Sequence, residues 1–225
     1  MSVGYFVVGT DTGIGKTHAT CALLHALARS HARVCGMKPI AAGGVRTAGG
    51  FSNEDSIAHR AASTVRVPPE LDNPILLPEP LSPHIAAARA GTPISFDAVL
   101  GAVAQLRART DALVVEGAGG FLVPLSGTQT GADLAVALGL PLVLVVGMRL
   151  GCLNHALLTA DAIRARGLTL AGWIANRIDP DFLCPEENLA YLRTHLDAPL
   201  WADLPFSRSP DPRADANRFT LPDVL

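Results

Sequence analysis

The sequence FVVGTDTGIGKTHATCALLHALA, residues 6–28, decides the fold. An apolar run leads into a glycine-rich turn that ends in Gly-Lys16-Thr17, and the residues after it space their apolar side chains three and four apart. A strand, a glycine-rich loop and a helix in this order are the context that a phosphate-binding loop requires. The backbone N–H groups of such a loop surround phosphate, the lysine reaches the β- and γ-phosphates, and the hydroxyl ligates Mg²⁺. The segment therefore predicts a nucleotide site, although its first glycine is Gly9 and the usual position holds Thr10.

The rest of the chain repeats this alternation of apolar runs and amphipathic segments. Short apolar runs predict strands over Tyr5–Val8, Arg33–Met37, Ala112–Val115, Leu142–Val146 and Leu170–Ala175. Spacings of three and four predict helices over Lys16–Ala28, Phe96–Arg107, Gly131–Leu138, Asn154–Arg166 and Glu186–Leu196. Because the strands lack polar alternation, we expect a parallel sheet covered on both faces. The order predicts one α/β domain over residues 1–225, a doubly wound, mainly parallel sheet with helices on both faces, similar to the P-loop NTPases.

Three stretches break the alternation. Pro39–Asn53 is rich in Gly and Ala, and Val67–Pro93 is rich in proline. The polar C-terminal stretch Pro205–Pro222 also contains several prolines. We expect all three to be loops, the first two around a site and the last over the surface.

Composition excludes several classes of protein. In 225 residues, 49% are hydrophobic and only 17% charged, so the chain can bury a large core and is not disordered. A net charge of −2 without a basic run argues against nucleic acid as a partner. The most apolar charge-free stretch, Leu134–Met148, is shorter than the roughly 20 residues that span a bilayer, so no membrane is expected. The N-terminus lacks the pattern of a signal peptide, and the four cysteines lack C-x-x-C spacing, so we expect a cytoplasmic protein with reduced thiols.

Polar side chains follow the predicted strands where a nucleotide site needs them. Glu116 ends an apolar strand before Gly117-Ala118-Gly119, and a carboxylate in this place is a typical Mg²⁺ ligand. Lys38 and Asn176 end two other strands, where a lysine can pair with phosphate and an amide can contact a base. Spacing alone equally allows both to be ordinary strand-end residues. Asp55, taken by itself, is better explained as an acid at a helix N-terminus.

The whole set of motifs resembles the dethiobiotin synthetase family. The resemblance rests on GTDTGIGKT, MKPIAAGG, NEDS, EPLSPHIAA, VEGAGGFLVPL, VVGMRLGCLNHALLTA and LAGWIANRI, in the order of that family, from residue 9 to about residue 178. It implies an ATP-dependent cyclo-ligase of biotin biosynthesis. Such an enzyme joins 7,8-diaminopelargonic acid and CO₂ through a carbamate and a carbamic-phosphoric anhydride, and releases dethiobiotin, ADP and phosphate.

The resemblance also implies roles for particular residues. Mg²⁺ would be held by Thr17, Asp55 and Glu116. Lys38 and Lys16 would act on the reacting phosphoryl and carbamate oxygens. The nucleotide would be bound by Gly13, Ile14, Gly15, Lys16, Thr17, His18, Asp55, Glu116, Gly117, Ala118, Gly119, Asn176, Arg177, Pro205, Phe206 and Ser207.

The diamine substrate would lie between two subunits of a homodimer. The family pattern places Thr12, Lys38, Ala42, Leu150, Gly151, Cys152, Leu153 and Asn154 beside it. The last five head a predicted helix, whose N-terminal N–H groups would take the carboxylate of the substrate. Helix N-termini favour anions, which gives this assignment an independent physical reason.

The chain departs from the family at three of these positions. Many members have Glu at the position of Gly13 and Ser at that of Ala42, so a charge partner and a hydrogen bond of roughly 0.5–1.5 kcal/mol are lost near the diamine. Arg177 stands where Asp is common beside adenine. We therefore expect altered diamine binding and relaxed selectivity for the base.

Two other interpretations start from the same loop. A switch ATPase of the partition and cell-division type carries a second lysine five residues before Lys16, but this chain has Asp11 there. An amidotransferase acting on corrinoid precursors continues into a glutaminase domain, for which 225 residues leave no room. The synthetase interpretation is therefore preferred.

Overall fold

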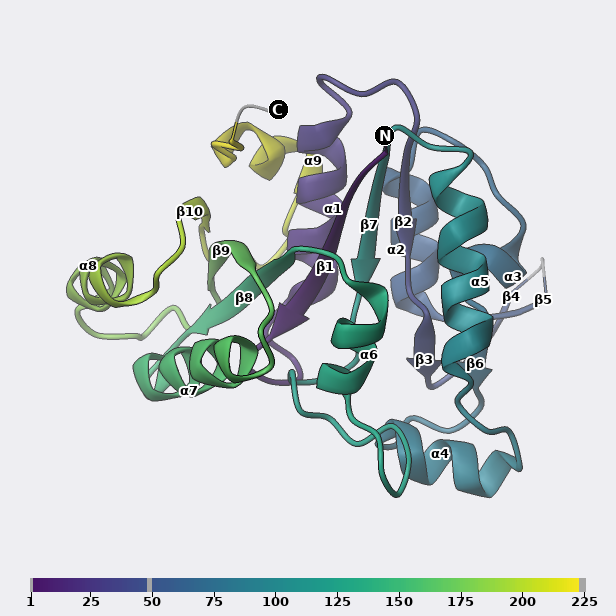
Figure 1. Cartoon of the computed structure of the whole chain (residues 1–225). Coiled ribbons are helices and arrows are strands. Elements are labelled where there is room, and N and C mark those ends of the chain that lie inside the picture. Colours follow the sequence, from purple (N-terminus) through teal and green to yellow (C-terminus); the bar gives the residue numbers. More distant parts are fainter. Residues whose placement is uncertain (1, 48–49, 223–225) are drawn as a thin grey trace.

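A six-stranded sheet forms the centre of the molecule. The computed structural model describes residues 2–47 and 50–222 (Figure 1). The strand order is β10-β9-β8-β1-β7-β2, and every neighbouring pair is parallel. The strands are β1 (Val3–Gly9), β2 (Val34–Met37), β7 (Ala112–Glu116), β8 (Leu142–Met148), β9 (Leu170–Arg177) and β10 (Leu200–Leu204).

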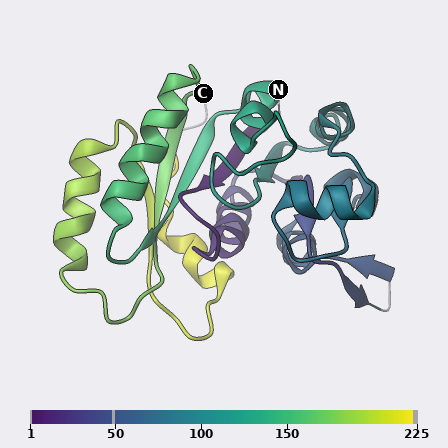
Figure 2. The same ribbon diagram turned by 90° about the horizontal axis from the view of Figure 1, so that it is seen from below.

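Helices cover both faces of this sheet. The helices in the described part are α1 (Lys16–Leu27), α2 (Glu54–Ala62), α3 (Pro69–Asp72), α4 (Pro83–Ala90), α5 (Phe96–Arg107), α6 (Gly131–Leu138), α7 (Cys152–Ala165), α8 (Pro185–His195) and α9 (Pro212–Asp215), followed by a 3₁₀ turn over Ala216–Arg218. Helices α5 to α8 share one apolar cluster with alternate strand residues such as Phe6 and Val8. Helix α1, Ala62 of α2 and Ala216 of the 3₁₀ turn share the opposite cluster, which contains Val7. Figures 1 and 2 show these two layers, so the doubly wound parallel α/β fold is confirmed.

Strands β7 and β8 are buried along their whole length because both faces of the sheet are covered. All seven residues of β8 are buried, and so are all five of β7, including the terminal Glu116. The register aligns β1 with its two neighbours, since Val7 pairs with Glu116 and Gly9 with Val145. The carboxyl ends of these strands therefore lie along one edge of the sheet.

The predicted strands and helices all exist, with ends shifted by up to two residues. Helices over Phe96–Arg107 and Gly131–Leu138 have the predicted bounds. Helix α7 begins two residues before the predicted Asn154. Gly139 caps α6 with a left-handed φ of 60°, and Gly167 follows α7 with a φ of 67°. The sixth strand, β10, was not predicted.

The expectation of three loops was wrong in large part. Pro39–Asn53 contains β3 (Ile40–Ala42) and the antiparallel hairpin of β4 (Val45–Thr47) and β5 (Gly50–Ser52), while residues 48–49 lie outside the described part. Val67–Pro93 contains α3, α4 and β6 (Ile75–Leu77), which pairs in parallel with β3. Pro205–Pro222 contains α9 and the 3₁₀ turn. Prolines begin α3, α4 and α9, where the missing N–H costs nothing, so they mark helix starts and not loops.

Two further observations concern the cysteines and the length of the helices. All four cysteines are unpaired thiols, and only Cys184 is exposed. In the described part of the chain, every helix is too short or too polar to cross a bilayer.

Candidate active site

The phosphate-binding loop joins β1 to α1. Gly13 and Gly15 have φ values of 73° and 80°, in the left-handed region that glycine adopts without strain. A Cβ at Gly15 would lie 2.2 Å from Nδ2 of Asn176, so this position also needs the absence of a side chain. Lys16 Nζ folds back over the loop and donates to the carbonyl of Asp11 at 2.7 Å. The loop therefore has the curled backbone that phosphate binding requires.

A buried ionic cluster lies beside the loop at the carboxyl edge of the sheet. Lys38 Nζ, just after β2, lies 2.6 Å from Glu116 Oε1 at the end of β7 and 2.8 Å from Asp55 Oδ2 on α2. Thr17 Oγ1 lies 2.8 Å from Asp55 Oδ1 and 3.2 Å from Glu116 Oε1. We call Thr17, Lys38, Asp55, Glu116 and His59 the edge cluster. Because β2 and β7 are adjacent and in register, Lys38 and Glu116 reach the same point from far apart in sequence.

Burial makes the charges of the edge cluster interdependent. Glu116 is fully buried and Lys38 is 5% exposed. Burial alone would raise the pKa of Glu116, but the Lys38 ammonium and the His59 imidazole hold it well below its usual range. Burial alone would lower the pKa of Lys38, yet Glu116 and Asp55 raise it. Burial also lowers the pKa of Lys16 to about 8, and the nearby Lys38 ammonium adds to this shift, so Lys16 has less anionic compensation than Lys38.

His59 is a member of the edge cluster that the sequence analysis missed. Its Nε2 lies 2.8 Å from Glu116 Oε2, and the side chain is 1% exposed. His59 and Asp55 are four residues apart on α2, which puts both on one face of the helix. That spacing was a signal that the sequence contained. A second missed residue is Arg149, whose guanidinium pairs with Asp11 of the phosphate loop at 2.7 Å.

The edge cluster offers the donors that Mg²⁺ prefers. Thr17, Asp55 and Glu116 contribute one hydroxyl and two carboxylates, all hard oxygen donors. In the described part of the chain, no group of three or more His, Cys, Asp and Glu side chains is arranged to hold a metal by itself. Mg²⁺ fits such a site, because it usually binds through one or two carboxylates together with substrate phosphates and water.

The predicted adenine residues lie across the loop from the edge cluster. Asn176 at the end of β9 donates from Nδ2 to the carbonyl of Ile14 at 2.7 Å, so it supports the phosphate loop. Arg177 is held by Asp203 and Glu186, each at 2.7 Å, and its guanidinium is therefore committed to carboxylates. The predicted segment Pro205-Phe206-Ser207 follows β10 directly, so the sheet brings it next to Asn176.

His18 connects the phosphate loop helix to the C-terminal segment. Its Nε2 lies 2.9 Å from Oδ2 of Asp215 on α9. Arg218 pairs with the other oxygen of the same carboxylate at 3.2 Å. The side chain of His18 therefore faces α9, and only its backbone N–H remains as the group suited to phosphate.

The predicted substrate residues lie in two places, one at the carboxyl edge of the sheet and the other at the start of α7. Thr12 is in the phosphate loop and Ala42 ends β3. Residues 150–154 lie at the start of α7, where Gly151 caps the helix with a φ of 93° and Leu150 is 90% exposed. No hydrogen bond within the described residues links 150–154 to the edge cluster. The structure of one chain therefore leaves the start of α7 facing outward.

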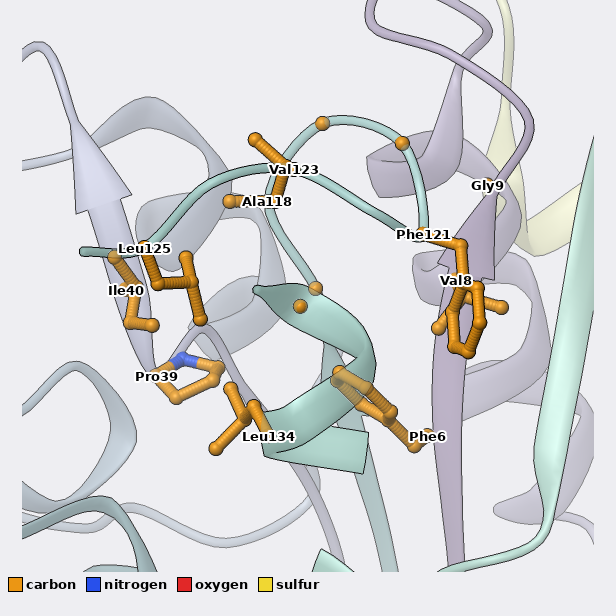
Figure 3. A pocket seen from close by; sticks show the side chains of 14 residues that line it. Phe6, Val8, Gly9, Pro39, Ile40, Ala118, Phe121, Val123, Leu125 and Leu134 are labelled. Atoms are coloured by element: carbon orange, nitrogen blue, oxygen red, sulfur yellow. The ribbon is translucent and has the colours of Figure 1, made fainter. Parts of the chain in front are cut away.

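Two hollows border the site, and they differ in size and character. The first, shown in Figure 3, is an apolar cavity behind the glycine-rich loop after β7, lined by side chains such as Phe6, Ile40 and Leu134. Its volume of about 10 Å³ holds at most one water, so it is core space. The second is an open hollow of about 360 Å³ between Thr10, residues 120–123 and α7. Only the second can admit an organic substrate.

Known proteins resemble this chain over almost its whole length. A family model described as an AAA domain matches residues 3–213. The chain is 53% identical over 220 residues to the ATP-dependent dethiobiotin synthetase of Aromatoleum aromaticum, covering 97% of each chain. It is also 53% identical to that of Ralstonia nicotianae, covering 98% of this chain and 96% of the relative.

Solved structures resemble the chain in fold. The MinC:MinD cell division protein complex of Aquifex aeolicus matches with a TM-score of 0.57 and 17% identity, over 92% of this chain and 82% of that one. Identity this low supports the P-loop fold alone and does not favour a switch ATPase. The sequence relatives, which match over almost the whole chain, decide the family. The chain therefore belongs to the ATP-dependent dethiobiotin synthetases, ligases of biotin biosynthesis.

Proposed function

We propose that the chain, acting as one catalytic domain, closes the ureido ring of dethiobiotin from 7,8-diaminopelargonic acid, CO₂ and Mg·ATP. One amine of the substrate takes up CO₂ as a carbamate. A carbamate oxygen attacks the γ-phosphorus of ATP and ADP leaves. The second amine attacks the carbamoyl carbon, phosphate leaves, and the cyclic urea forms.

The single observation that carries this proposal is the edge cluster beside the phosphate loop. Negative charge grows on carbamate and phosphoryl oxygens during phosphoryl transfer, so catalysis depends on positioned positive charge more than on a protein nucleophile. Lys16 and Lys38 approach the site from two elements, and both are buried. Lys38, held by Glu116 and Asp55, stays charged and fixed in position. It would therefore orient the carbamate and stabilise the transferring phosphoryl group.

Thr17, Asp55 and Glu116 would hold the Mg²⁺ ion. The ion supplies charge neutralisation at the phosphates when bound. The chain itself contributes the curled loop of Gly13 to His18, whose backbone N–H groups are suited to phosphate oxygens. Asn176 keeps this loop in place through the carbonyl of Ile14 and has its amide oxygen available for adenine. Arg177 would act on base selectivity only through Asp203 and Glu186.

We expect the diamine to bind between two copies of the chain. The start of α7 points outward, and Leu122 and Leu158 beside the open hollow are more than half exposed. Burial of these side chains by a second copy would bring the N-terminal N–H groups of α7 to the carboxylate of a neighbouring substrate. Gly13 has open space where a Cβ would project, so the lost family carboxylate leaves room beside the diamine.

Release of ADP tests the proposal. Purified protein with Mg·ATP should release ADP rapidly only when both 7,8-diaminopelargonic acid and bicarbonate are present, with one dethiobiotin formed per ADP. Omission of either should reduce turnover to background. Equal ADP release without the diamine would refute the synthetase reaction and favour an ATPase that makes no product.

A further inference from the structure

The two oxygens of the Glu116 carboxylate have different partners. Oε1 lies 2.6 Å from Lys38 Nζ and 3.2 Å from Thr17 Oγ1, on the side of the phosphate loop. Oε2 lies 2.8 Å from His59 Nε2, on the side of α2. The carboxylate is fully buried, so each oxygen needs a partner within the protein. His59 therefore decides which oxygen of Glu116 faces the nucleotide.

The position of His59 is itself fixed by packing. A Cβ at Gly36 of β2 would lie 2.9 Å from Cβ of His59, so the glycine permits α2 to pack directly on the strand. The start of α2 is capped by Asn53, whose side chain accepts from the backbone N–H of Asp55 at 3.0 Å. Helix α2 thus presents both Asp55 and His59 to the edge cluster from a rigid backbone.

The hydrogen bonds of the ring assign its donor. Glu116 pairs with the Lys38 ammonium through Oε1 at 2.6 Å, and a carboxylate paired in this way only accepts hydrogen bonds. His59 Nε2 must therefore carry the hydrogen. Nδ1 is buried without a hydrogen-bond partner, so a hydrogen there would be an unsatisfied buried donor, whereas a bare lone pair costs less.

We propose that His59 is a positioning residue that holds Glu116 with Oε1 turned toward Thr17 and the bound metal–nucleotide complex. Without the donor at Oε2, the carboxylate is free to turn both oxygens to Lys38, and its geometry as a metal ligand is lost. This inference rests on the proposed Mg·ATP site. Mutation of a group that orients a metal-binding side chain in this way commonly lowers metal affinity by about 10- to 100-fold.

The test measures Mg²⁺-dependent binding of a non-hydrolysable ATP analogue by calorimetry. His59→Leu removes the Nε2–H donor and puts an apolar side chain of similar size in its place. His59→Gln restores an N–H close to the position of Nε2. His25→Leu, in the last turn of α1, is the matched control for replacing a histidine with leucine. Melting curves without nucleotide show that each variant is folded.

We expect His59→Leu to raise the Mg²⁺ concentration for half-maximal binding by about tenfold and to leave Mg²⁺-free nucleotide affinity unchanged. His59→Gln should lie within about threefold of the parent, and His25→Leu should match it. Should His59→Leu not fold, His59→Asn replaces it, because its amide is too short to reach Glu116.

Three results would overturn the inference. An unchanged Mg²⁺ dependence in His59→Leu would show that His59 does not position the ligand. Equal losses in His59→Leu and His59→Gln would show that the ring acts by packing. Nucleotide binding by the parent that does not depend on Mg²⁺ would refute the proposed metal site, and the inference with it.

Discussion

Two groups of ion pairs lie at the carboxyl edge of the same sheet, one after β2 and β7 and the other after β9 and β10. In the edge cluster the side chains of Lys38 and Glu116 are 6% and 0% exposed, whereas in the other group those of Arg177 and Glu186 are 26% and 67% exposed. Water screens the second group, so its pairs contribute little to stability. In the edge cluster, loss of one charge leaves its partner buried without compensation.

This difference in solvent exposure indicates a different role for each group of ion pairs. Glu116 and Asp55 keep Lys38 charged against the effect of burial. Burial of the Lys38–Glu116 pair strengthens the action of this charge on developing negative charge, because the local dielectric is low. In the more exposed group, Asp203 and Glu186 can hold the Arg177 guanidinium away from a bound base. The fold does not depend on these ion pairs. Variants in the two groups should therefore separate catalysis from simple charge pairing.

The largest effect is expected for Lys38→Met. This change removes the ammonium and keeps most of the side-chain volume, and it leaves Glu116 with His59 and the Thr17 hydroxyl as partners. The kcat for dethiobiotin formation should fall by about 10²–10³-fold, while ATP affinity changes by less than tenfold. The free energy of unfolding should fall by about 3 kcal/mol in urea titrations. An unchanged kcat would remove Lys38 from the mechanism.

A smaller effect is expected in the phosphate loop. Gly15→Ala combines a φ of 80° with a Cβ placed 2.2 Å from Asn176, whereas Gly13→Ala meets a φ of 73° and open space. Gly15→Ala should weaken ATP binding by more than about 100-fold, and Gly13→Ala by about 5- to 30-fold, since the strain alone costs about 1–2 kcal/mol. Calorimetric titration measures both, and equal losses would show that contact with Asn176 is unimportant.

Asp133 provides a partly exposed carboxylate whose pKa is lowered by hydrogen bonds and not by burial. Hydrogen bonds from the Thr130 hydroxyl and backbone N–H, and one from Arg166, lower the pKa of Asp133 to about 2. Asp133→Ala should cost about 1 kcal/mol of stability at pH 7, because the cap of α6 is lost. Since the folded pKa is below the unfolded value near 4, this contribution is present above pH 4 and disappears as the pH falls toward 2. Urea titrations of parent and variant at pH 7 and pH 3 check this, and a constant difference would contradict it.

The smallest effect is expected for Arg177→Met, the counterpart of Lys38→Met in the open group. Solvent screens its pairs with Asp203 and Glu186, so the free energy of unfolding should change by less than about 1 kcal/mol. Any change in activity should appear in the KM for ATP and not in kcat. A loss of stability as large as that of Lys38→Met would contradict the contrast between the two groups.

The sequence predicted the parts of the fold that depend on local patterns. Apolar runs located β1, β2, β7, β8 and β9, because buried parallel strands need no alternation. Strand β10 (Leu200–Leu204) was missed, since it is short and includes Asp203. Helices α3 and α4 were missed because Pro69 and Pro83 were interpreted as breaks, although each is the first residue of a helix.

The candidate site was predictable where a polar residue directly ends a strand. Lys38 and Glu116 are such residues, and the sheet register brings them together. Asp55 was assigned to the site only through the family resemblance, because no local sequence pattern shows that α2 packs against β2. The spacing of Asp55 and His59 was a local signal, but the contacts of His59 with Glu116 and of Arg149 with Asp11 are long-range and leave no local pattern. The roles proposed for the other nucleotide and substrate residues stay predictions.

The most direct test of the account is a crystal structure with Mn²⁺ in place of Mg²⁺, a non-hydrolysable ATP analogue and 7,8-diaminopelargonic acid. We predict an anomalous peak bound by oxygens of Thr17, Asp55 and Glu116, the terminal phosphate beside Lys38, and the diamine next to that phosphate between two copies of the chain. A metal peak away from these three residues, or a diamine in a distant pocket, would contradict it.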